Sequence, residues 1–330
     1  MAWAIANANL ALVKYWGKLP GAGNHAASGS ISVTLDGLAT LAGVRFDPGL
    51  REDRVEWRPA GPADRVVEFL DRARRRLGVS SHAQVLLAST FPVAAGLASS
   101  ASTFAALATA TVAAAGAELP LSALAALARE GSGSACRSLL GGFVEWRPGS
   151  TDEVVAVFAE DHWPLAIRIA VTSEAPKPVG SREGMLRTAR SSPYYAAWIA
   201  QSPGDLEEAR SAIAARDLAR LGTLAERNCL RMHAVAMASD PPLLYWEPAT
   251  VAVIQEVWSL RRRGIEAYFT IDAGPQVKVL CDPGAASAVE AALGAVPGVR
   301  RVLRSGPGRG PELVGEPPAW AEFASGWVGG

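Results

Sequence analysis

Residues 92–102 read Pro92-Val-Ala-Ala-Gly-Leu-Ala-Ser-Ser-Ala-Ser102, and an alanine-rich stretch from Thr103 to about Ala115 follows them. The apolar residues Val85 to Leu87, just before this segment, predict a strand, and the alanine-rich stretch predicts a helix. A loop of small residues that leads into a helix exposes backbone N–H groups where the helix dipole favours an anion. This order of strand, loop and helix is therefore a candidate phosphate-binding unit.

The hydroxyl groups of this segment leave two interpretations open. They can bond phosphate oxygens or a magnesium ion, or they can form an ordinary serine-rich helix cap. Neither the Walker A pattern nor the dinucleotide-binding pattern is matched, so the segment alone does not decide between the two. The hydroxyls belong to Ser99, Ser100 and Ser102.

The rest of the chain predicts a mixed α+β protein. Apolar runs predict strands at residues 10–15, 31–35, 141–146, 165–171, 267–271 and 277–280, with one more strand and a turn within 152–163. Helical periodicity is found at residues 65–77, 121–129, 192–200, 205–215, 218–232 and 249–263. We expect a domain boundary near Trp163-Pro164 and an irregular tail from Ser305 to Gly330.

Composition excludes several classes of function. The 330 residues are 49% hydrophobic, which suffices for a large core, and 32 basic residues balance 32 acidic ones. With no net charge there is no basic field for nucleic acid or an anionic membrane, and no stretch predicts a membrane span. The three cysteines are widely separated, as expected in a reducing cytoplasm. Any anion that binds must be held by local groups.

Two further segments carry candidate functional residues. Gly131-Ser-Gly-Ser-Ala-Cys-Arg137 is a second loop of small residues, and its arginine suits a carboxylate or phosphate, although a surface ion pair is the more common role. Thr270-Ile-Asp-Ala-Gly-Pro-Gln276 places an aspartate after an apolar strand, either at the mouth of a cleft or as a turn-forming residue. Four arginines are expected on a solvated helix face, at positions 72, 74, 75 and 76, and His233 is expected to be packed.

Taken with Asn9-Leu-Ala-Leu-Val-Lys-Tyr-Trp-Gly-Lys18, these segments resemble the diphosphomevalonate decarboxylase family of the GHMP kinase superfamily. The matches follow the family's order through nearly the whole chain, at residues 14–18, 30–36, 95–102, 131–142, 179–185, 231–233 and 269–275. The segment from Ala95 is shared across the superfamily, whereas residues 14–18 and 131–137 are specific to the decarboxylase branch. The resemblance implies a two-domain α+β fold, with domains at residues 1–164 and 165–330 and the active site in the cleft between them.

The resemblance also implies a reaction and a set of roles. ATP phosphorylates the 3-hydroxyl of mevalonate 5-diphosphate, phosphate departs, and loss of carbon dioxide gives isopentenyl diphosphate. Asp272 is implied as general base or orienting acceptor, Lys14 as its partner, Arg137 as the holder of the substrate carboxylate, and Ser100 as the group that orients the transferred phosphoryl. The implied substrate contacts are Asn9, Tyr15, Lys18, Ser132, Ser134, Ser181, Arg182 and Met185. The implied ATP contacts are Gly96, Leu97, Ala98, Ser99, Ser100 and Ser102, with Mg2+ carried by ATP rather than by a protein site of its own, and a homodimer is implied as well.

Three departures from the family pattern leave alternatives open. The loop over the substrate reads Asn24-His-Ala-Ala-Ser-Gly-Ser30 without the usual proline, Pro20 and Gly21 replace a charged pair, and Gln276 stands where asparagine is usual. Loop changes of this kind alter substrate choice without altering a fold. The alternatives are a phosphomevalonate decarboxylase, a mevalonate 3-kinase, and a catalytically silent ligand-binding relative.

Overall fold

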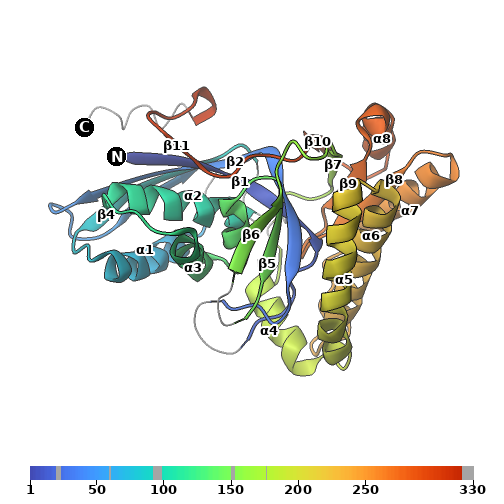
Figure 1. Ribbon diagram of the computed structural model, residues 1–330, viewed down its shortest axis with the longest axis horizontal. Coiled ribbons are helices and arrows are strands. Elements are labelled where there is room, and N and C mark those ends of the chain that lie inside the picture. Colours follow the sequence, from blue (N-terminus) through green and yellow to red (C-terminus); the bar gives the residue numbers. More distant parts are fainter. Residues whose placement is uncertain (20–23, 59–60, 92–98, 150–152, 176, 322–330) are drawn as a thin grey trace.

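The structure is a computed structural model that describes residues 1–19, 24–58, 61–91, 99–149, 153–175 and 177–321. Elements from the first half of the chain occupy one end of its long axis, and helices from the second half stand at the other end (Figure 1). The strands are β1 (Ala2–Val13), β2 (Ser30–Asp47), β3 (Arg54–Arg58), β4 (His82–Ser89), β5 (Phe143–Arg147), β6 (Glu153–Phe158), β7 (Ala166–Val171), β8 (Ala267–Ile271), β9 (Val277–Cys281), β10 (Arg301–Ser305) and β11 (Glu312–Val314).

The helices fall into two groups along the chain. The first group is α1 (Ala63–Leu77), α2 (Ser99–Ala114), α3 (Leu121–Gly131) and the 3-10 helix η1 (Gly133–Leu139). The second is α4 (Ser181–Ser191), α5 (Tyr195–Ala215), α6 (Leu218–Met237), α7 (Pro248–Arg262), the 3-10 turn η2 (Pro283–Ala285) and α8 (Ala286–Gly294). Together with the strands they confirm the predicted α+β class.

The larger sheet is organised around the long strand β2. Its strand order is β11-β1-β2-β4-β3, and β5 also pairs with β2 and carries β6 on its other side. Residues 40–47 of β2 pair with β4 and residues 30–33 pair with β5, so the strand changes partner near Gly37, whose φ is +76°. A left-handed backbone favours glycine, which has no Cβ to clash. One strand thereby serves two parts of the sheet.

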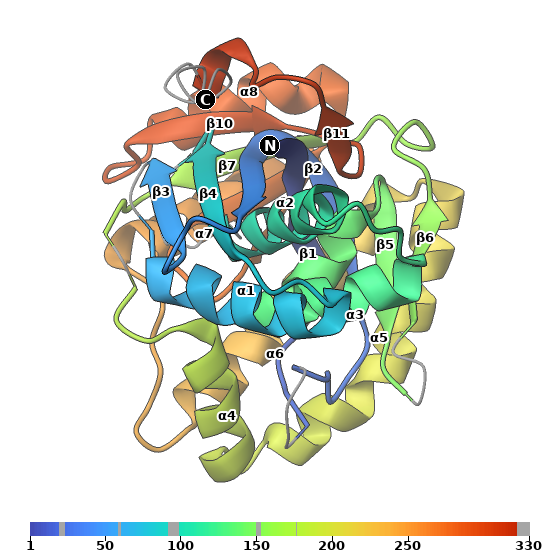
Figure 2. The same ribbon diagram turned by 90° about the vertical axis from the view of Figure 1, so that its left-hand side faces the viewer.

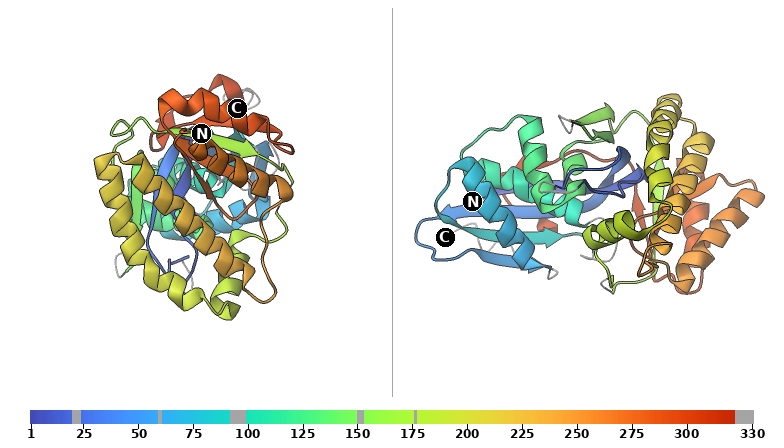
Figure 3. Two further views of the ribbon diagram at one scale, coloured as in Figure 1. Left: turned by 90° about the vertical axis from the view of Figure 1, so that its right-hand side faces the viewer. Right: turned by 90° about the horizontal axis from the view of Figure 1, so that it is seen from below.

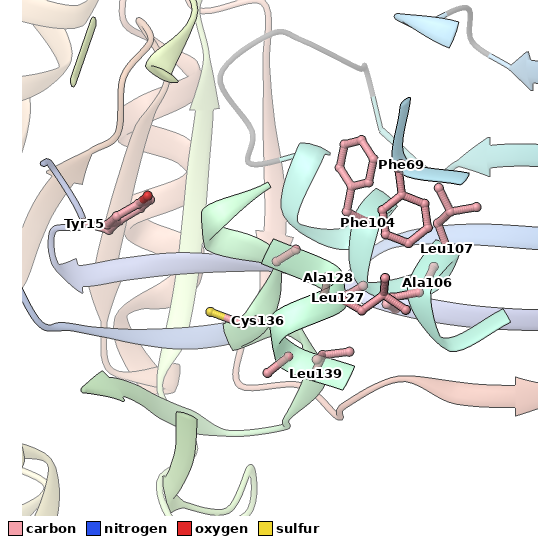
Figure 4. Packing of buried hydrophobic residues seen from close by; sticks show 14 of the residues in the cluster. Tyr15, Phe69, Phe104, Ala106, Leu107, Leu127, Ala128, Cys136 and Leu139 are labelled. Carbon is pink, nitrogen blue, oxygen red and sulfur yellow. The ribbon is translucent and has the colours of Figure 1, made fainter. Parts of the chain in front are cut away.

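Helix α2 is buried on almost every side because it lies between the sheet and other helices. It contacts β1 and β2 on one side and α3 and η1 on the other, which suits its alanine-rich sequence. Figure 2 shows α1, α2 and α3 in front of the larger sheet. In the core between them the rings of Phe69 on α1 and Phe104 on α2 lie 5.7 Å apart, near Leu107 and Leu127 (Figure 4). This packing fixes the direction in which the first turn of α2 points.

The smaller sheet has the order β10-β7-β9-β8, and all its pairs are antiparallel. Helices α6 and α7 pack on β8 and β9, while α8 packs on β7 and β10. The view from below in Figure 3 shows these helices grouped at the end formed by the second half of the chain. Helix α6 also contacts β1, so it joins the smaller sheet to the first strand of the larger one.

Several predicted elements differ from the observed ones. Helix α2 begins at Ser99 rather than Thr103, and α5 runs unbroken through Pro203, because Trp198, Ser202, Asp205 and Ala209 keep one face buried across it. The stretch from Ser305 was expected to be irregular, but β11 pairs with residues 3–5 of β1. Elements β3, α4, α8 and β10 were not predicted. The predicted boundary at Trp163-Pro164 falls between β6 and β7 and stays a prediction.

One expectation about charge is wrong. Arg74 was placed on a solvated helix face, but its side chain is 10% exposed and its guanidinium donates to both carboxylate oxygens of Asp53, at 2.7 and 2.9 Å, and also to Asp71. Asp53 comes from the turn before β3, which the helical pattern of α1 alone does not reveal. None of the helices in the described residues is long and apolar enough to cross a membrane.

Candidate active site

A cavity of about 660 Å³ opens between the N-terminal half and α4. It is lined by residues from β1 and the loop after it, the first turns of α1 and α2, η1, the segment before α4, and the turn after β8. Among the lining residues are six basic side chains, Lys14, Lys18, Arg65, Arg137, Lys177 and Arg182, and three acidic ones, Glu68, Glu183 and Asp272. The cavity therefore carries an excess of positive charge, although the net charge of the whole chain is zero.

Asp272 lies at one end of this cavity between two lysines. Its Oδ1 accepts a hydrogen bond of 2.8 Å from Nζ of Lys14, and its Oδ2 lies 3.2 Å from Nζ of Lys278. Both lysines are almost completely buried, and the aspartate side chain is 22% exposed. We call Asp272, Lys14 and Lys278 the carboxylate end of the cavity.

The local sequence explains how Asp272 and Lys14 come together. Asp272 directly follows β8, whose five residues are all buried, and Lys14 directly follows β1. The backbone N–H of Lys14 donates to Oδ1 of Asn228 at 2.8 Å, and the amide of Asn228 donates to Oδ2 of Asp205 at 2.8 Å. Helices α5 and α6 thus hold the end of β1 in place beside the end of β8.

The electrostatics of this end favour an ionised aspartate. Burial alone would raise the pKa of the Asp272 carboxyl, but the ammonium groups of Lys14 and Lys278 outweigh burial and hold that pKa well below its usual range. Burial lowers the pKa of Lys278, against the opposing effect of Asp272. The arrangement offers a permanently charged hydrogen-bond acceptor to a hydroxyl group in the cavity.

Arg137 is a buried cation whose protein partners are all neutral. It is 2% exposed, and its guanidinium donates to the hydroxyls of Ser32 at 3.1 Å and Ser30 at 2.6 Å, and to Oδ1 of Asn9 at 3.1 Å. Within the described part of the chain it forms no salt bridge. A buried positive charge without a counter-charge favours an anionic ligand in the cavity that it lines.

The predicted serines separate into two groups. The hydroxyl of Ser100 lies 3.2 Å from that of Ser132, which lies 3.2 Å from that of Ser134, and all three line the cavity with Ser99. Ser102 does not join them, because its hydroxyl bonds Thr40 of β2 at 2.8 Å inside the protein. Gly96, Leu97 and Ala98 lie outside the described residues. Two of the three candidate serines in the first turn of α2, Ser99 and Ser100, therefore line the cavity.

Three further cations that line the cavity form no salt bridge among the described residues. Lys18 donates to Oδ1 of Asn24 at 2.6 Å, Arg65 donates to the carbonyl of Gly131 at 2.7 Å, and neither they nor Arg182 form a salt bridge among the residues described. Burial, together with the charges of Arg182 and Arg65, lowers the pKa of Lys18 to about 8. We call Lys18, Arg65 and Arg182 the cation end.

The other predicted substrate contacts also lie in the cavity wall. Ser181 begins α4, and Met185 is buried one turn later on the same helix. Tyr15 is buried beneath the guanidinium of Arg137, with 5.9 Å between that group and the ring centroid. Asn9 bridges Arg137 and the hydroxyl of Ser138, to which its amide donates at 2.8 Å.

Three basic residues of the site were missed by the sequence analysis. Lys177 donates to the hydroxyl of Ser181 at 2.8 Å and to the carbonyl of Ala273 at 3.0 Å, and burial lowers its pKa to about 8. Arg65 was read only as the start of a helix. Lys278 did carry a signal, because it interrupts an otherwise apolar strand and a buried lysine needs a partner.

The departures from the family pattern have different structural roles. Gln276 is fully buried and braces the end of β7, since its Oε1 accepts from the N–H of Thr172 at 2.7 Å. Asn24, in contrast, lines the cavity and contacts Lys18. Pro20 and Gly21 lie outside the described residues.

His233 is packed, as predicted: its ring lies 3.3 Å from the carbonyl of Ile271, and burial lowers its pKa to about 3.

Comparisons with known proteins agree in one family. Residues 6–156 match the diphosphomevalonate decarboxylase-like N-terminal domain, and residues 167–297 match the mevalonate 5-diphosphate decarboxylase C-terminal domain. The chain is 32% identical over 356 residues to diphosphomevalonate decarboxylase of Candida albicans, covering 93% of this chain and 96% of the relative. With the enzyme of Bos taurus it shares 34% identity over 82% of this chain and 74% of the relative.

Solved structures give the same result. Mevalonate diphosphate decarboxylase from Staphylococcus aureus superimposes with a TM-score of 0.89 at 36% identity, covering 95% of this chain and 97% of that one. The enzyme from Enterococcus faecalis has a TM-score of 0.88 at 36% identity, with 95% and 98% coverage. A complex of a similar protein with MVAPP, AMPPCP and magnesium also has a TM-score of 0.88 at 36% identity.

Proposed function

Because the chain belongs to the diphosphomevalonate decarboxylase family, we propose that it uses ATP to convert mevalonate 5-diphosphate into isopentenyl diphosphate, carbon dioxide, ADP and phosphate. The observation that carries the proposal is the composition of the cavity. It combines one aspartate kept ionised by two lysines with a buried arginine and a group of cations that lack acidic partners. These are the groups needed to orient a hydroxyl, a carboxylate and a diphosphate.

In this proposal Asp272 accepts a hydrogen bond from the 3-hydroxyl of the substrate. An ionised carboxylate within about 3 Å of the hydroxyl orients its oxygen for attack on the terminal phosphorus of ATP. Because the two lysines stabilise the charged form, Asp272 is a weak base. Its main contribution is to orient the hydroxyl, and it accepts the hydroxyl proton late, as the new O–P bond forms and makes that proton acidic.

Arg137 is the proposed binding group for the substrate carboxylate. Its three neutral partners fix the guanidinium plane and leave the charge for a ligand. Once phosphate leaves C3, the C1–C2 bond breaks and its electrons form the C2–C3 double bond. Carbon dioxide is uncharged, so the contact to Arg137 weakens as it forms, and the contribution of Arg137 is to hold the carboxylate in line for this step. Asn9, Ser132 and Ser134 line the same part of the cavity.

The diphosphate is proposed to bind at the cation end. Lys18 and Arg182 supply charge, Ser181 a hydroxyl at the start of α4, and Tyr15 and Met185 part of the wall. A phosphate chain with several negative charges would compensate the repulsion between these cations, which burial intensifies.

The residues also fit ATP with Mg2+. Ser99 and Ser100 stand at the N-terminus of a sixteen-residue helix that faces the cavity, where backbone N–H groups and hydroxyls suit a phosphate chain. ATP supplies the phosphoryl group, and Mg2+ bound to its phosphates spreads their negative charge. Gly96, Leu97 and Ala98 remain proposed ATP contacts by resemblance. Ser102 is left out of the proposal because its hydroxyl bonds Thr40.

Three broader assignments accompany this one. We propose the division into residues 1–164 and 165–330, supported by the family matches on either side of Trp163-Pro164. A cytoplasmic location is supported by three buried cysteines that form no disulfide among the described residues. The homodimer is proposed from the resemblance alone, and sedimentation of the purified protein tests it.

The deciding experiment is an assay of ATP-dependent release of carbon dioxide from mevalonate 5-diphosphate, mevalonate 5-phosphate and mevalonate. We expect the highest kcat/KM with the diphosphate. A preference for the monophosphate would make the chain a phosphomevalonate decarboxylase, and ADP formation without carbon dioxide would make it a 3-kinase. Absence of turnover with all three compounds would indicate a catalytically silent relative.

A further inference from the structure

Lys278 occupies a position that an amino group rarely takes. It lies in β9, all five of whose residues are buried, and it is itself 2% exposed. It does not line the cavity. Burial of an ammonium group is costly unless a charged partner compensates it, so a lysine in this strand needs a specific reason.

The strand register explains which group Lys278 meets. Lys278 pairs with Thr270 of the neighbouring strand β8. Directly paired residues project from the same face of a sheet, and so do residues two apart along a strand. The side chain of Lys278 therefore extends toward Asp272, two residues after Thr270, and its ammonium reaches Oδ2 at 3.2 Å.

The two oxygens of Asp272 have different surroundings. Oδ2 is buried, and among the described residues its ion-pair partner is Lys278. Oδ1 is bonded to Lys14, which lines the cavity. Lys14 alone would leave the carboxylate free to turn, because the terminal torsion of an aspartate has a broad energy minimum. A second contact on the other oxygen restricts that rotation.

We propose that Lys278 is a positioning residue for the phosphoryl-transfer step: it anchors the buried oxygen of Asp272 so that the other oxygen is presented, charged, to the substrate hydroxyl. The inference rests on the proposed function only in assigning Asp272 to that hydroxyl. Lys278 therefore affects the rate of the chemical step and does not affect the binding of either substrate.

The charged and titratable groups around Asp272 support a distinct role for Lys278. Lys14 approaches from β1, Lys278 from β9, Lys177 from the segment before α4 and Arg137 from η1, while Cys229 and His233 face it from α6. Of these groups, Lys14 and Lys278 have the ammonium contacts to the carboxylate oxygens. Loss of Lys278 would therefore leave one oxygen of a buried carboxylate without its counter-charge.

The test is the pH dependence of turnover in Lys278→Met, whose side chain has nearly the same length and no charge. We expect kcat to fall about tenfold to a hundredfold, with KM for ATP and for mevalonate 5-diphosphate within about twofold of the parent. Removal of a nearby cation raises the pKa of a carboxyl by about one to three units, so the acid limb of the kcat profile, which in the parent lies well below the usual range of a carboxyl, should move up toward that range. Lys278→Arg should recover most of the rate and the parental acid limb.

Arg74→Met is the matched control, since it also removes a buried cation from an aspartate, but away from the cavity. It should lower the melting temperature and leave the pH profile unchanged. If Lys278→Met fails to fold, Lys278→Gln takes its place with the same expectations.

Two results would overturn the inference. The first is a parental kcat and acid limb in the uncharged variant. The second is a loss of rate that Lys278→Arg does not recover and that leaves the acid limb in place, because that pattern indicates a purely structural lysine. Asp272→Asn is measured alongside: if it stays active, the proposed function of the site is wrong, whereas an inactive Asp272→Asn with a parental Lys278→Met rejects this inference alone.

Discussion

The two ends of the cavity treat charge in opposite ways. At the carboxylate end, Asp272 is neutralised by Lys14 and Lys278 within the protein itself. At the cation end, Lys18 has a neutral partner and Arg182 has no salt bridge among the described residues. Paired charges fix a group in one state before any ligand arrives, whereas unpaired charges repel one another until an anion enters. We therefore expect the rate of the chemical step to depend on the carboxylate end, and the affinity for the substrate to depend on the cation end.

The largest effect is expected from Asp272→Asn, which removes the negative charge of Asp272 and retains the shape of its side chain. The variant should bind ATP normally and lose at least about a hundredfold in kcat, the scale for a positioned acid or base. Calorimetric titration with an ATP analogue and steady-state kinetics measure the two quantities. Near-normal turnover would remove Asp272 from the mechanism.

Arg182→Ala tests the cation end through the choice of substrate. Charge-assisted bonds contribute roughly 1.5–3 kcal/mol each, so loss of the guanidinium should lower kcat/KM for the diphosphate by about tenfold to a hundredfold. The monophosphate should be affected much less. A diphosphate preference that survives the substitution undiminished would show that the distal phosphate binds elsewhere, and Arg187→Ala on the outer turn of α4 is the control.

Arg137→Lys tests whether Arg137, which has only neutral partners among the described residues, contributes to the release of carbon dioxide. An ammonium cannot donate two parallel bonds to a carboxylate, so release of carbon dioxide should fall about tenfold while ATP affinity is retained. Comparison of carbon dioxide release with ATP binding in one preparation decides the point. Equal loss of both would place Arg137 on the nucleotide, and a lowered melting temperature would identify a structural role.

The smallest expected effect is a dependence on pH of the affinity for mevalonate 5-diphosphate, caused by titration of Lys18 at the cation end. The pKa of Lys18 is lowered to about 8, so the side chain is charged below that pH and loses its proton as the pH rises through it. Affinity for mevalonate 5-diphosphate should therefore weaken a few-fold between about pH 7 and 9, with proton uptake on binding at the upper end. Lys18→Arg, which stays charged, should flatten this dependence. Because the pKa of Lys177 is also about 8, Lys177→Arg serves as the parallel measurement.

The contrast between the two ends also explains what the sequence reveals. Asp272, Lys14 and Arg137 occur in ordered motifs with small residues around them, and each of these residues lines the cavity. The partner of Lys278 could not be predicted, because it is set by the register of β8 and β9, a long-range property that no local pattern contains. Arg65 and Lys177 have ordinary local surroundings, and only the packing of α1 and α4 brings them to the cavity.

Element boundaries account for the remaining differences. The helix predicted from Thr103 begins at Ser99, so residues 99, 100 and 102 are spaced around a helical turn rather than along a loop. Ser102 consequently faces β2 while Ser99 and Ser100 face the cavity. Residues 201–204 lay between two predicted helices, at 192–200 and 205–215, yet α5 runs through them because the residues on either side of Pro203 keep one face buried. Tertiary packing decides where these helices begin and whether they continue, and the periodicity of the sequence cannot predict either.

The pairing of β11 with β1 has a consequence for synthesis of the chain. Residues 3–5 leave the ribosome long before residues 312–314, which cover their outer edge in the described structure. An uncovered strand edge is a template for association with other chains. The chain therefore carries this edge of the larger sheet open until residues 312–314 have been made, and until then pairing with other chains competes with folding.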